Sequence, residues 1–310
     1  MNINSINKEE FYKYFESINI YNSKAFIDLN SCKVSEVKYL LFKERKVKAG
    51  IILGINDNFC FSHFSAPYGG FIFSNQKISL QSIYNITNCL DSWFVGKKYK
   101  GIKITPPPLF YDQSLISELS NCFNRLKYSL SIDLNYHFEL KFMNDNYLSV
   151  IYPNARKNLK KGFRNSLKFK KVSKQASFQK VYSILKLNRE QRGLSLKLSF
   201  KEIMDHTKII TTDFFMILLE SKIIASAICF RLNSDKVQVI YWGHDTDFNT
   251  YAPMNYLSYN IFRYYKNLNF KIVDIGPSTK NGLPNYGLCR FKRSIGCSVS
   301  NKFQFQKTKN

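Results

Sequence analysis

The stretch from Val237 to Gly296 decides the fold. Its consecutive segments read VQVIYWGHDTDF (237–248), NTYAPMNYLSYNIFRYYKN (249–267), FKIVDIGPS (270–278) and TKNGLPNYGLCRFKRSIG (279–296). This order predicts a strand, a turn that opens into an amphipathic helix, a second strand, and a polar Gly/Pro loop that holds Lys292. Because a β-α-β unit brings the carboxyl ends of two parallel strands beside a helix N-terminus, we expect a ligand at that edge.

The composition indicates a folded protein with an excess of positive charge. The 310 residues suffice for two domains of ordinary size or one large domain, and 45% apolar with 16% aromatic residues indicates a sizeable core. The formal net charge of +24 has two interpretations. One is an anionic partner, such as a phosphorylated cofactor, a nucleic acid or a membrane surface. The other is the Lys- and Asn-rich composition that an AT-rich genome favours throughout a chain.

Cysteine and histidine usage gives no sign of a metal site. Seven cysteines are scattered without a C-x-x-C pair, and the four histidines do not cluster. This pattern is typical of reduced thiols in a cytoplasmic protein. The N-terminal segment lacks the apolar run of a signal peptide, and no apolar run has the length of a membrane span. We therefore expect a soluble cytoplasmic chain without metal.

The two halves of the chain share one order of predicted elements. In the first half, a hairpin, a strand broken at Pro67, a helix and a proline-stopped strand follow one another. The same four elements return in the second half at a separation of roughly 170–180 residues. This repetition predicts two α/β domains, which we place at residues 1–140 and 141–310.

Among the helices predicted outside the repeat, two have a marked pattern. One covers residues 7–20, and its apolar face consists of Phe11, Tyr14, Phe15 and Ile18. The other is a basic helix over 156–171, with Leu159, Phe163 and Leu167 as its apolar stripe and nine Lys or Arg residues between Arg156 and Lys174. That charge is either a solvated face or a positive wall beside a phosphate-bearing ligand.

The order of elements resembles the GCN5-related N-acetyltransferase (GNAT) fold, present twice, as in the double-GNAT group that includes the FemABX peptidoglycan aminoacyltransferases and related sugar N-acyltransferases. The residues that carry the resemblance are Pro67-Tyr68-Gly69-Gly70, Arg156-Lys157-Asn158-Leu159, Asn188-Arg189-Glu190 with Arg192-Gly193, and the run Gly276-Pro277-Ser278, Gly282, Asn285, Gly287-Leu288, Phe291-Lys292, Gly296. The resemblance implies an α/β (α+β) chain of two tandem domains, each a mixed, mostly antiparallel sheet flanked by helices.

Two departures from the group bear on the acyl donor. The chain lacks the long coiled-coil insertion of many tRNA-dependent members, which favours acyl-coenzyme A as cosubstrate over charged tRNA. The glycine-rich pyrophosphate loop of ordinary GNAT enzymes is also unmatched. Its place is taken by a segment that would hold the donor phosphates with its backbone at the helix start, namely Asn249, Thr250, Tyr251, Ala252, Pro253 and Met254. The strand before it, at Tyr241, Trp242 and Gly243, would meet the thioester.

Acyl transfer to an amine needs a neutral amine, a polarised carbonyl and a stabilised oxyanion. His244, Asp245, Asp247 and Asp274 are the candidate bases. His244 is either this base or a histidine in a surface turn. Asp245 remains a catalytic candidate, Asp247 is expected to cap the next helix, and Asp274 is either a paired core group or a substrate ligand. By the resemblance, Lys292 contacts substrate phosphate or stabilises charge in the transition state; the alternative is a surface lysine.

The acceptor would lie among residues from both halves: Tyr68, Gly69, Gly70, Asp274, Ser278, Asn285, Tyr286 and Lys292. The resemblance implies an acyl-CoA-dependent N-acyltransferase for a nucleotide-linked, specifically dTDP-linked, amino sugar of bacterial surface polysaccharide (lipopolysaccharide O-antigen or capsule). The first alternative is an aminoacyl-tRNA-dependent peptidoglycan-precursor aminoacyltransferase. The second, a non-enzymatic basic nucleic-acid-binding protein, lacks any helix-turn-helix, zinc-finger or RNP signature.

Overall fold

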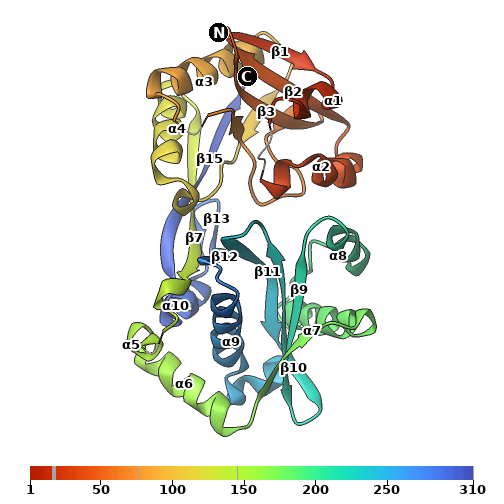
Figure 1. The fold of residues 1–310 in the computed structure, drawn as a ribbon, viewed down its shortest axis with the longest axis vertical. Helices are drawn as coiled ribbons and strands as arrows, with labels where there is room; N and C mark the ends of the chain where they lie inside the picture. Colours follow the sequence, from red (N-terminus) through yellow and green to blue (C-terminus); the bar gives the residue numbers. More distant parts are fainter. Residues whose placement is uncertain (16–18, 76, 145, 310) are drawn as a thin grey trace. The chain divides into compact units, whose positions relative to one another are not determined.

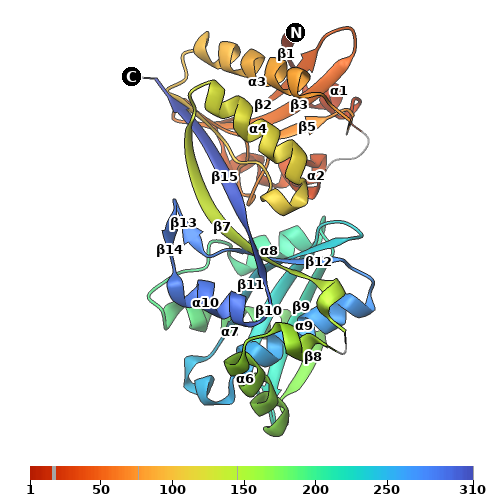
Figure 2. The ribbon, with the colours of Figure 1, turned by 90° about the vertical axis from the view of Figure 1, so that its left-hand side faces the viewer.

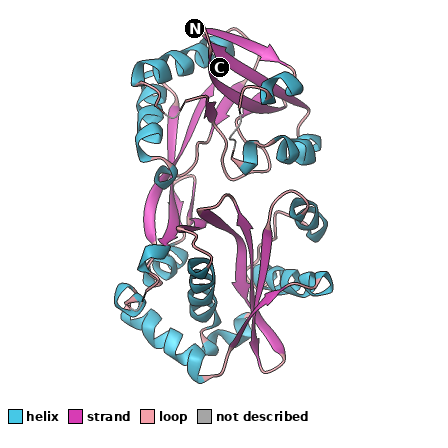
Figure 3. Ribbon diagram, viewed as in Figure 1, coloured by secondary structure: helices cyan, strands magenta, loops and turns pink. Residues whose placement is uncertain are grey.

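The computed structural model describes residues 1–15, 19–75, 77–144 and 146–309, and the chain forms two compact units (Figure 1). Unit 1 contains residues 1–134, 279–283 and 300–310. Unit 2 contains residues 135–278 and 284–299. Both units are mixed sheets flanked by helices, as the sequence predicts (Figure 3).

The sheet of unit 1 has one parallel pair, β4 with β6, and is otherwise antiparallel. Its strands lie in the order β1 (Asn2–Ile6), β2 (Glu36–Lys43), β3 (Val47–Asn56), β4 (Phe59–Phe61), β6 (Gly101–Ile104) and β15 (Ser298–Thr308), with β5 (Phe71–Phe73) paired to β3. The helical elements are α1 (Lys8–Tyr12), η1 (Ile20–Asn22), α2 (Lys24–Asn30), η2 (Ser31–Lys33), α3 (Leu80–Val95), η3 (Leu109–Tyr111) and α4 (Gln113–Arg125). The predicted apolar face of α3, with Ile83, Ile86, Leu90 and Phe94, is fully buried in the core.

The sheet of unit 2 repeats this plan, again with one parallel pair, β11 with β12. Its strands lie in the order β7 (Ser129–Glu139), β12 (Ile272–Pro277), β11 (Lys236–His244), β10 (Lys222–Arg231), β9 (Thr212–Leu219) and β8 (Lys168–Val172). The helical elements are η4 (Leu140–Phe142), α5 (Tyr147–Val150), α6 (Pro153–Arg164), η5 (Gln175–Ser177), α7 (Phe178–Glu190), α8 (Phe200–Thr207), η6 (Thr246–Tyr251), α9 (Pro253–Asn267) and α10 (Tyr286–Ser294). A small ribbon, β13 (Thr279–Lys280) with β14 (Leu283–Pro284), precedes α10.

The repeat is regular until its last strand, which the two halves exchange. In unit 2, β12 pairs antiparallel with β7, the strand that follows α4 in the first half. In unit 1, β6 pairs antiparallel with β15, the strand that follows α10 in the second half. Figure 2 shows β7 and β15 as two long strands, and each of them pairs with a strand from the other half of the sequence. The predicted domains, residues 1–140 and 141–310, do not include this exchange of strands. The alternation of apolar and polar residues identifies a strand, but it does not show which sheet the strand joins.

Three local predictions are wrong. The helix predicted over 7–20 is shorter: α1 ends at Tyr12, Phe11 and Phe15 are buried, Tyr14 is exposed, and Ile18 lies outside the described residues. The basic helix ends at Arg164 rather than 171, because Ser166 has a φ of 53° and the chain then forms strand β8 against β9. Lys292 lies in helix α10, not in a loop.

Candidate functional site

The carboxyl ends of the parallel strands β11 and β12 diverge. Their shared register runs from Lys236–Ile272 to Gln238–Asp274 and ends there, although β11 continues to His244 and β12 to Pro277. On its other side, β11 carries a bulge, because Ile240 has no partner between the Cys229–Val239 and Ile228–Tyr241 pairs. A bulge beside a diverging pair turns backbone groups toward the opening. Beyond Gln238, β11 has no partner on the β12 side among the described residues, and this open edge is the candidate place for a ligand.

The equivalent edge in unit 1 is closed by the chain itself. After β4, the N–H of Ser62 donates to the carbonyl of Lys103 (2.9 Å), and the N–H of Gly69 donates to that of Thr105 (2.8 Å). A Cβ at Gly69 would lie 1.7 Å from the Ser62 carbonyl oxygen, so this fit requires glycine. Tyr68 is buried with its ring 5.1 Å from that of Tyr21. Tyr68, Gly69 and Gly70, predicted to bind substrate, thus all have structural roles within unit 1, where the Gly70 N–H donates to the Ser62 carbonyl.

Asp274 lies fully buried at the point where the strands separate. Its carboxylate accepts hydrogen bonds from Asn135 Nδ2 (2.8 Å), Gln238 Nε2 (2.9 Å) and the Gly276 N–H (2.9 Å). These donors come from three strands and are neutral. Of the two roles predicted for Asp274, this geometry fits the paired core group, which fixes the base of the opening.

Lys292 binds the end of β12 that diverges from β11. Its Nζ donates to the carbonyl oxygens of Ile275 (2.8 Å), Gly276 (2.8 Å) and Pro277 (3.1 Å), and the side chain is only 2% exposed. The ring of Tyr136 lies 5.4 Å from the same nitrogen. Burial lowers the pKa of Lys292 to about 8. The ammonium group donates three hydrogen bonds to backbone carbonyls. Lys292 is therefore not the surface lysine of the alternative prediction.

His244 ends β11, and its ring is held by Asn249. Its Nε2 lies 2.6 Å from Asn249 Oδ1, so with the amide in this orientation Nε2 carries the proton. Nδ1 is then a lone-pair acceptor, and it is buried without a hydrogen-bond partner among the described residues. Burial lowers the pKa of His244 below its ordinary value, which keeps the ring neutral at neutral pH.

Helix α7 fixes the end of β11 from the side. Asn188 Nδ2 donates to the His244 carbonyl (2.6 Å), and Gln191 bridges the Asp245 carboxylate (2.9 Å) and the Thr246 N–H (3.0 Å). A Cβ at Gly243 would lie 2.6 Å from Asn188 Oδ1, so glycine permits this clamp. Sequence reasoning missed the roles of Asn188 and Gln191. Asn188 stands in a motif of the resemblance, but Gln191 carries no pattern that could have found it.

Asp245 is a helix cap in this arrangement. Its Oδ1 accepts the N–H of Asp247 (3.2 Å) at the start of η6, so the cap predicted for Asp247 is made by Asp245. Tyr241 OH accepts the N–H of Leu198 (3.1 Å), and the Trp242 ring lies 6.0 Å from that of Phe291. The structure thus places these residues in contacts within unit 2.

The start of α9 is free of side-chain capping. Thr250 and Tyr251 end the preceding η6, Ala252 has a left-handed φ of 53°, and Pro253 opens the helix with no capping hydrogen bond. Pro253 has no N–H group, so Met254 supplies the first free donor of the helix. A helix start of this kind attracts phosphate.

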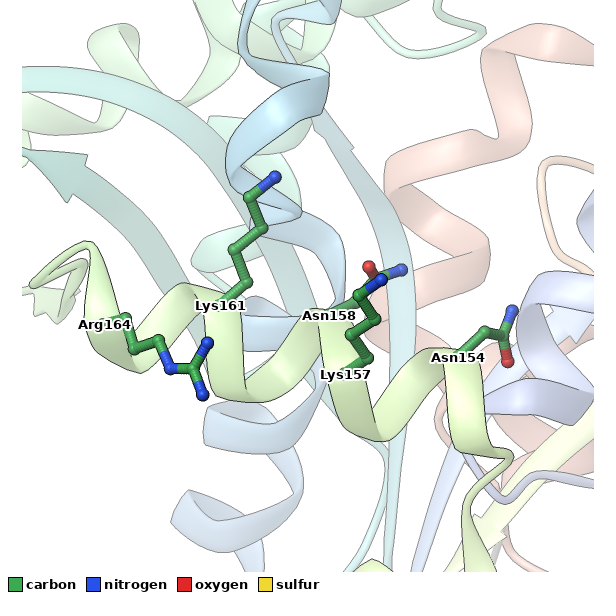
Figure 4. Close-up of a pocket in the computed structure, with 5 residues that line it drawn as sticks. All are labelled: Asn154, Lys157, Asn158, Lys161 and Arg164. Carbon is green, nitrogen blue, oxygen red and sulfur yellow. The ribbon is translucent and has the colours of Figure 1, made fainter.

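A basic hollow lies on α6, next to this helix start. It has a volume of about 560 Å³ and is lined by Asn154, Lys157, Asn158, Lys161 and Arg164, which form a row along α6 (Figure 4). α6 packs against α9 and contacts η6. The approach is close because Gly162 faces Tyr256, where a Cβ would lie 2.9 Å from the tyrosine Cβ. α6, the helix that carries Lys157 and Lys161, thus contacts both α9 and the η6 segment before it.

The remaining predicted residues lie around the N-terminus of α10. Asn285 Oδ1 accepts the Leu288 N–H (3.0 Å) and so caps the helix, and its own N–H donates to the Ser278 carbonyl (2.9 Å). Ser278 is buried, and its hydroxyl has no partner among the described residues. Tyr286 is 76% exposed.

Comparisons with known proteins identify the fold. No family model and no curated protein matches the sequence. Among solved structures, FemX matches over 100% of this chain and 98% of its own, with a TM-score of 0.69 and 11% identity. L-PGS from Bacillus licheniformis matches over 99% and 93% (TM-score 0.58, 10% identity). A tandem GNAT protein from the clavulanic acid biosynthesis pathway matches over 99% and 98% (TM-score 0.53, 7% identity). The chain therefore has the tandem GNAT-like fold that its sequence predicts.

Proposed function

We propose that this chain is an N-acyltransferase that moves an aminoacyl group from charged tRNA to the amine of a peptidoglycan precursor. The observation that carries the proposal is the open edge of β11, where the register with β12 ends at Gln238–Asp274. The equivalent edge of unit 1 is filled by residues 62–70. Unit 2 is accordingly the catalytic copy.

The chemistry follows from the groups at that edge. The neutral amine attacks the ester carbonyl of the donor, a C–N bond forms, and the carbonyl oxygen becomes an oxyanion. Backbone N–H groups beyond the Ile240 bulge donate to that oxyanion. His244 Nδ1 accepts the amine proton, which passes to the ribose hydroxyl as the C–O bond breaks. Lys292 acts as a positioning residue, because its three hydrogen bonds set the course of β12.

Charge favours a donor larger than a pyrophosphate. The row of cations in the hollow on α6, Lys157, Lys161 and Arg164, continues onto the exposed Lys168 and Lys170 of edge strand β8. None of these five side chains forms an ion pair among the residues that the structure describes. A row of unpaired cations along two consecutive elements suits a polynucleotide backbone. The FemX match over the whole chain points the same way.

A second candidate keeps the reaction and changes both substrates. The uncapped start of α9 at Met254 suits the pyrophosphate of an acyl-CoA. This donor would serve the acylation of a nucleotide-linked amino sugar, here a dTDP-linked one.

The test supplies both donors to the purified chain. Transfer of a labelled amino acid from charged tRNA to an acid-stable amide on a UDP-linked muramyl peptide, lost in His244→Gln, supports the first candidate. Thiol release from acyl-CoA that depends on an amino sugar, without transfer from tRNA, supports the second. Neither reaction with any donor, in protein shown to be folded, overturns acyl transfer altogether.

A further inference from the structure

One segment of unit 2 concentrates exposed apolar side chains. Fifteen large hydrophobic residues are exposed among the described residues, and five of them lie within the 22 residues from Phe142 to Phe163. An even spread along the chain would place about one there. The five, here called the α5–α6 patch, are Phe142, Leu148, Val150, Tyr152 and Phe163, with exposed fractions of 38–48%.

The patch gathers beside α9. The ring of Tyr147, which directly precedes Leu148, lies 5.5 Å from Tyr259 on α9, and the ring of Phe163 lies 5.6 Å from the same tyrosine. η4, which carries Phe142, also packs against α9. The three elements that carry the patch, η4, α5 and α6, thus all contact one helix.

The surroundings of the patch carry an excess of cations. η4, α5, α6 and α9 contain no acidic residue, whereas Asp145 stands between η4 and α5 in the sequence and Glu139 forms an ion pair with Lys141 (2.6 Å). Lys141 lies over the Phe142 ring (4.9 Å), Arg263 lies over the Tyr259 ring (5.4 Å), and Lys160 is exposed on α6. Exposed Leu, Val and Phe among Lys and Arg is the composition of surfaces that lie in the headgroup region of an anionic bilayer.

The patch is chemically distinct from the basic hollow. Leu148 and Val150 are aliphatic and offer no ring on which a base could stack, so these two side chains of the patch suit acyl chains and not RNA. On α6, Phe163 points about half a turn away from Lys161, which lines the hollow. No helix in the described part of the chain is long and apolar enough to cross a bilayer, so contact would be confined to the interface.

We propose that the α5–α6 patch docks unit 2 on an anionic membrane surface. Apolar side chains enter the boundary between headgroups and acyl chains, and Lys160 and Arg263 pair with lipid phosphates. The proposal is independent of the acyl donor and goes beyond the proposed transfer reaction.

Sedimentation of the full chain with vesicles tests the proposal. Binding is expected to vesicles that contain phosphatidylglycerol and to be much weaker with phosphatidylcholine alone. Leu148→Glu with Val150→Glu should weaken it at least about tenfold, because two charges enter the apolar contact. Val95→Glu is the matched control, since Val95 is 56% exposed on α3 of unit 1, and it should bind like the parent. Circular dichroism melting of each variant verifies folding.

Three outcomes overturn the proposal. One is no sedimentation with phosphatidylglycerol vesicles at low salt. Another is full retention of binding in the folded Leu148→Glu, Val150→Glu variant, which would reduce the interaction to charge alone. The third is equal loss of tRNA and vesicle binding in that variant, which would make the patch part of a nucleic-acid surface. Loss of vesicle binding with aminoacyl transfer to a soluble acceptor intact separates the two proposals.

Discussion

Lys292 Nζ donates a 2.8 Å hydrogen bond to the carbonyl of Gly276, a residue whose φ of 71° turns the chain at the end of β12. Ile275 and Pro277 on either side bind the same nitrogen. A buried cation thus holds three consecutive carbonyls of β12 that lie beyond its shared register with β11.

Replacement of Lys292 should change the pH dependence of stability. Burial lowers the pKa of Lys292 to about 8, well below its value in the unfolded chain. Between these two pKa values the unfolded state binds more protons, so this lysine makes the free energy of unfolding rise with pH from about pH 8 to about pH 10. In Lys292→Met that component disappears. Urea unfolding of both proteins across this range measures the difference, and parallel pH curves would contradict the assignment.

The His244–Asn249 pair should govern the rate of transfer at low pH. Because the pKa of His244 lies below its ordinary value, activity should be level at neutral pH and fall as the pH drops through that lowered pKa. His244→Gln should reduce kcat by about 10²–10⁴-fold and remove the acidic limb. Asn249→Ala removes the hydrogen bond that keeps the proton on Nε2 of His244, and it should lower kcat less than His244→Gln does. A pH–rate profile of all three proteins distinguishes a base from a structural histidine. If His244 is only structural, the fall in activity at acid pH will persist in His244→Gln.

Gly243→Ala should destabilise unit 2 by about 1–3 kcal/mol, because its Cβ would lie 2.6 Å from Asn188 Oδ1. Asn188→Gly removes the obstacle but leaves the His244 carbonyl without its donor. The two changes combined should therefore cost less than their sum. A double-mutant cycle by chemical denaturation measures the coupling; strict additivity would mean that the helix and strand do not constrain each other.

Asp213 should be among the most sensitive positions of unit 2. It is 2% exposed and accepts from Arg231 Nε (2.7 Å), Lys171 Nζ (2.9 Å) and Tyr265 OH (2.8 Å). Asp213→Asn leaves half-buried Arg231 without its counter-ion and should cost about 3 kcal/mol. These donors lower the pKa of the carboxyl. Its contribution is therefore present above the unfolded pKa and is lost as the pH falls through the folded one. Acid titration of parent and variant, monitored by fluorescence, measures the loss.

The basic hollow should control binding of the donor. Lys157→Glu with Lys161→Glu should weaken tRNA binding roughly ten- to a hundred-fold at low salt and reduce the slope of log K against log salt by about one to two. Lys97→Glu with Lys98→Glu, in unit 1, makes the same charge change away from α6 and is the control. Equal loss in both variants would show that only net charge matters.

The sequence predicted the repeat and the strand that ends in His244, because hydrophobic periodicity and turn residues mark elements reliably. It did not separate caps from ligands. Asp245 and Asn285 both cap helices, and which residue of a polar run does so depends on backbone angles that composition does not determine. The end of α6 was missed for a similar reason. Ser166 adopts a left-handed φ, and a serine in the sequence gives no signal that the backbone will do so.

The exchange of β7 and β15 also determines when this protein can fold. Phe305 of β15 pairs with Ile104 of β6, so the first sheet is incomplete until β15 has been synthesised. Until then, the apolar surfaces of β6 and α4 remain exposed, because the strand that covers them lies about 200 residues downstream. Neither half of the gene should yield a stable product by itself. A nascent chain stalled before β15 would expose this apolar surface and would therefore be a client for chaperones.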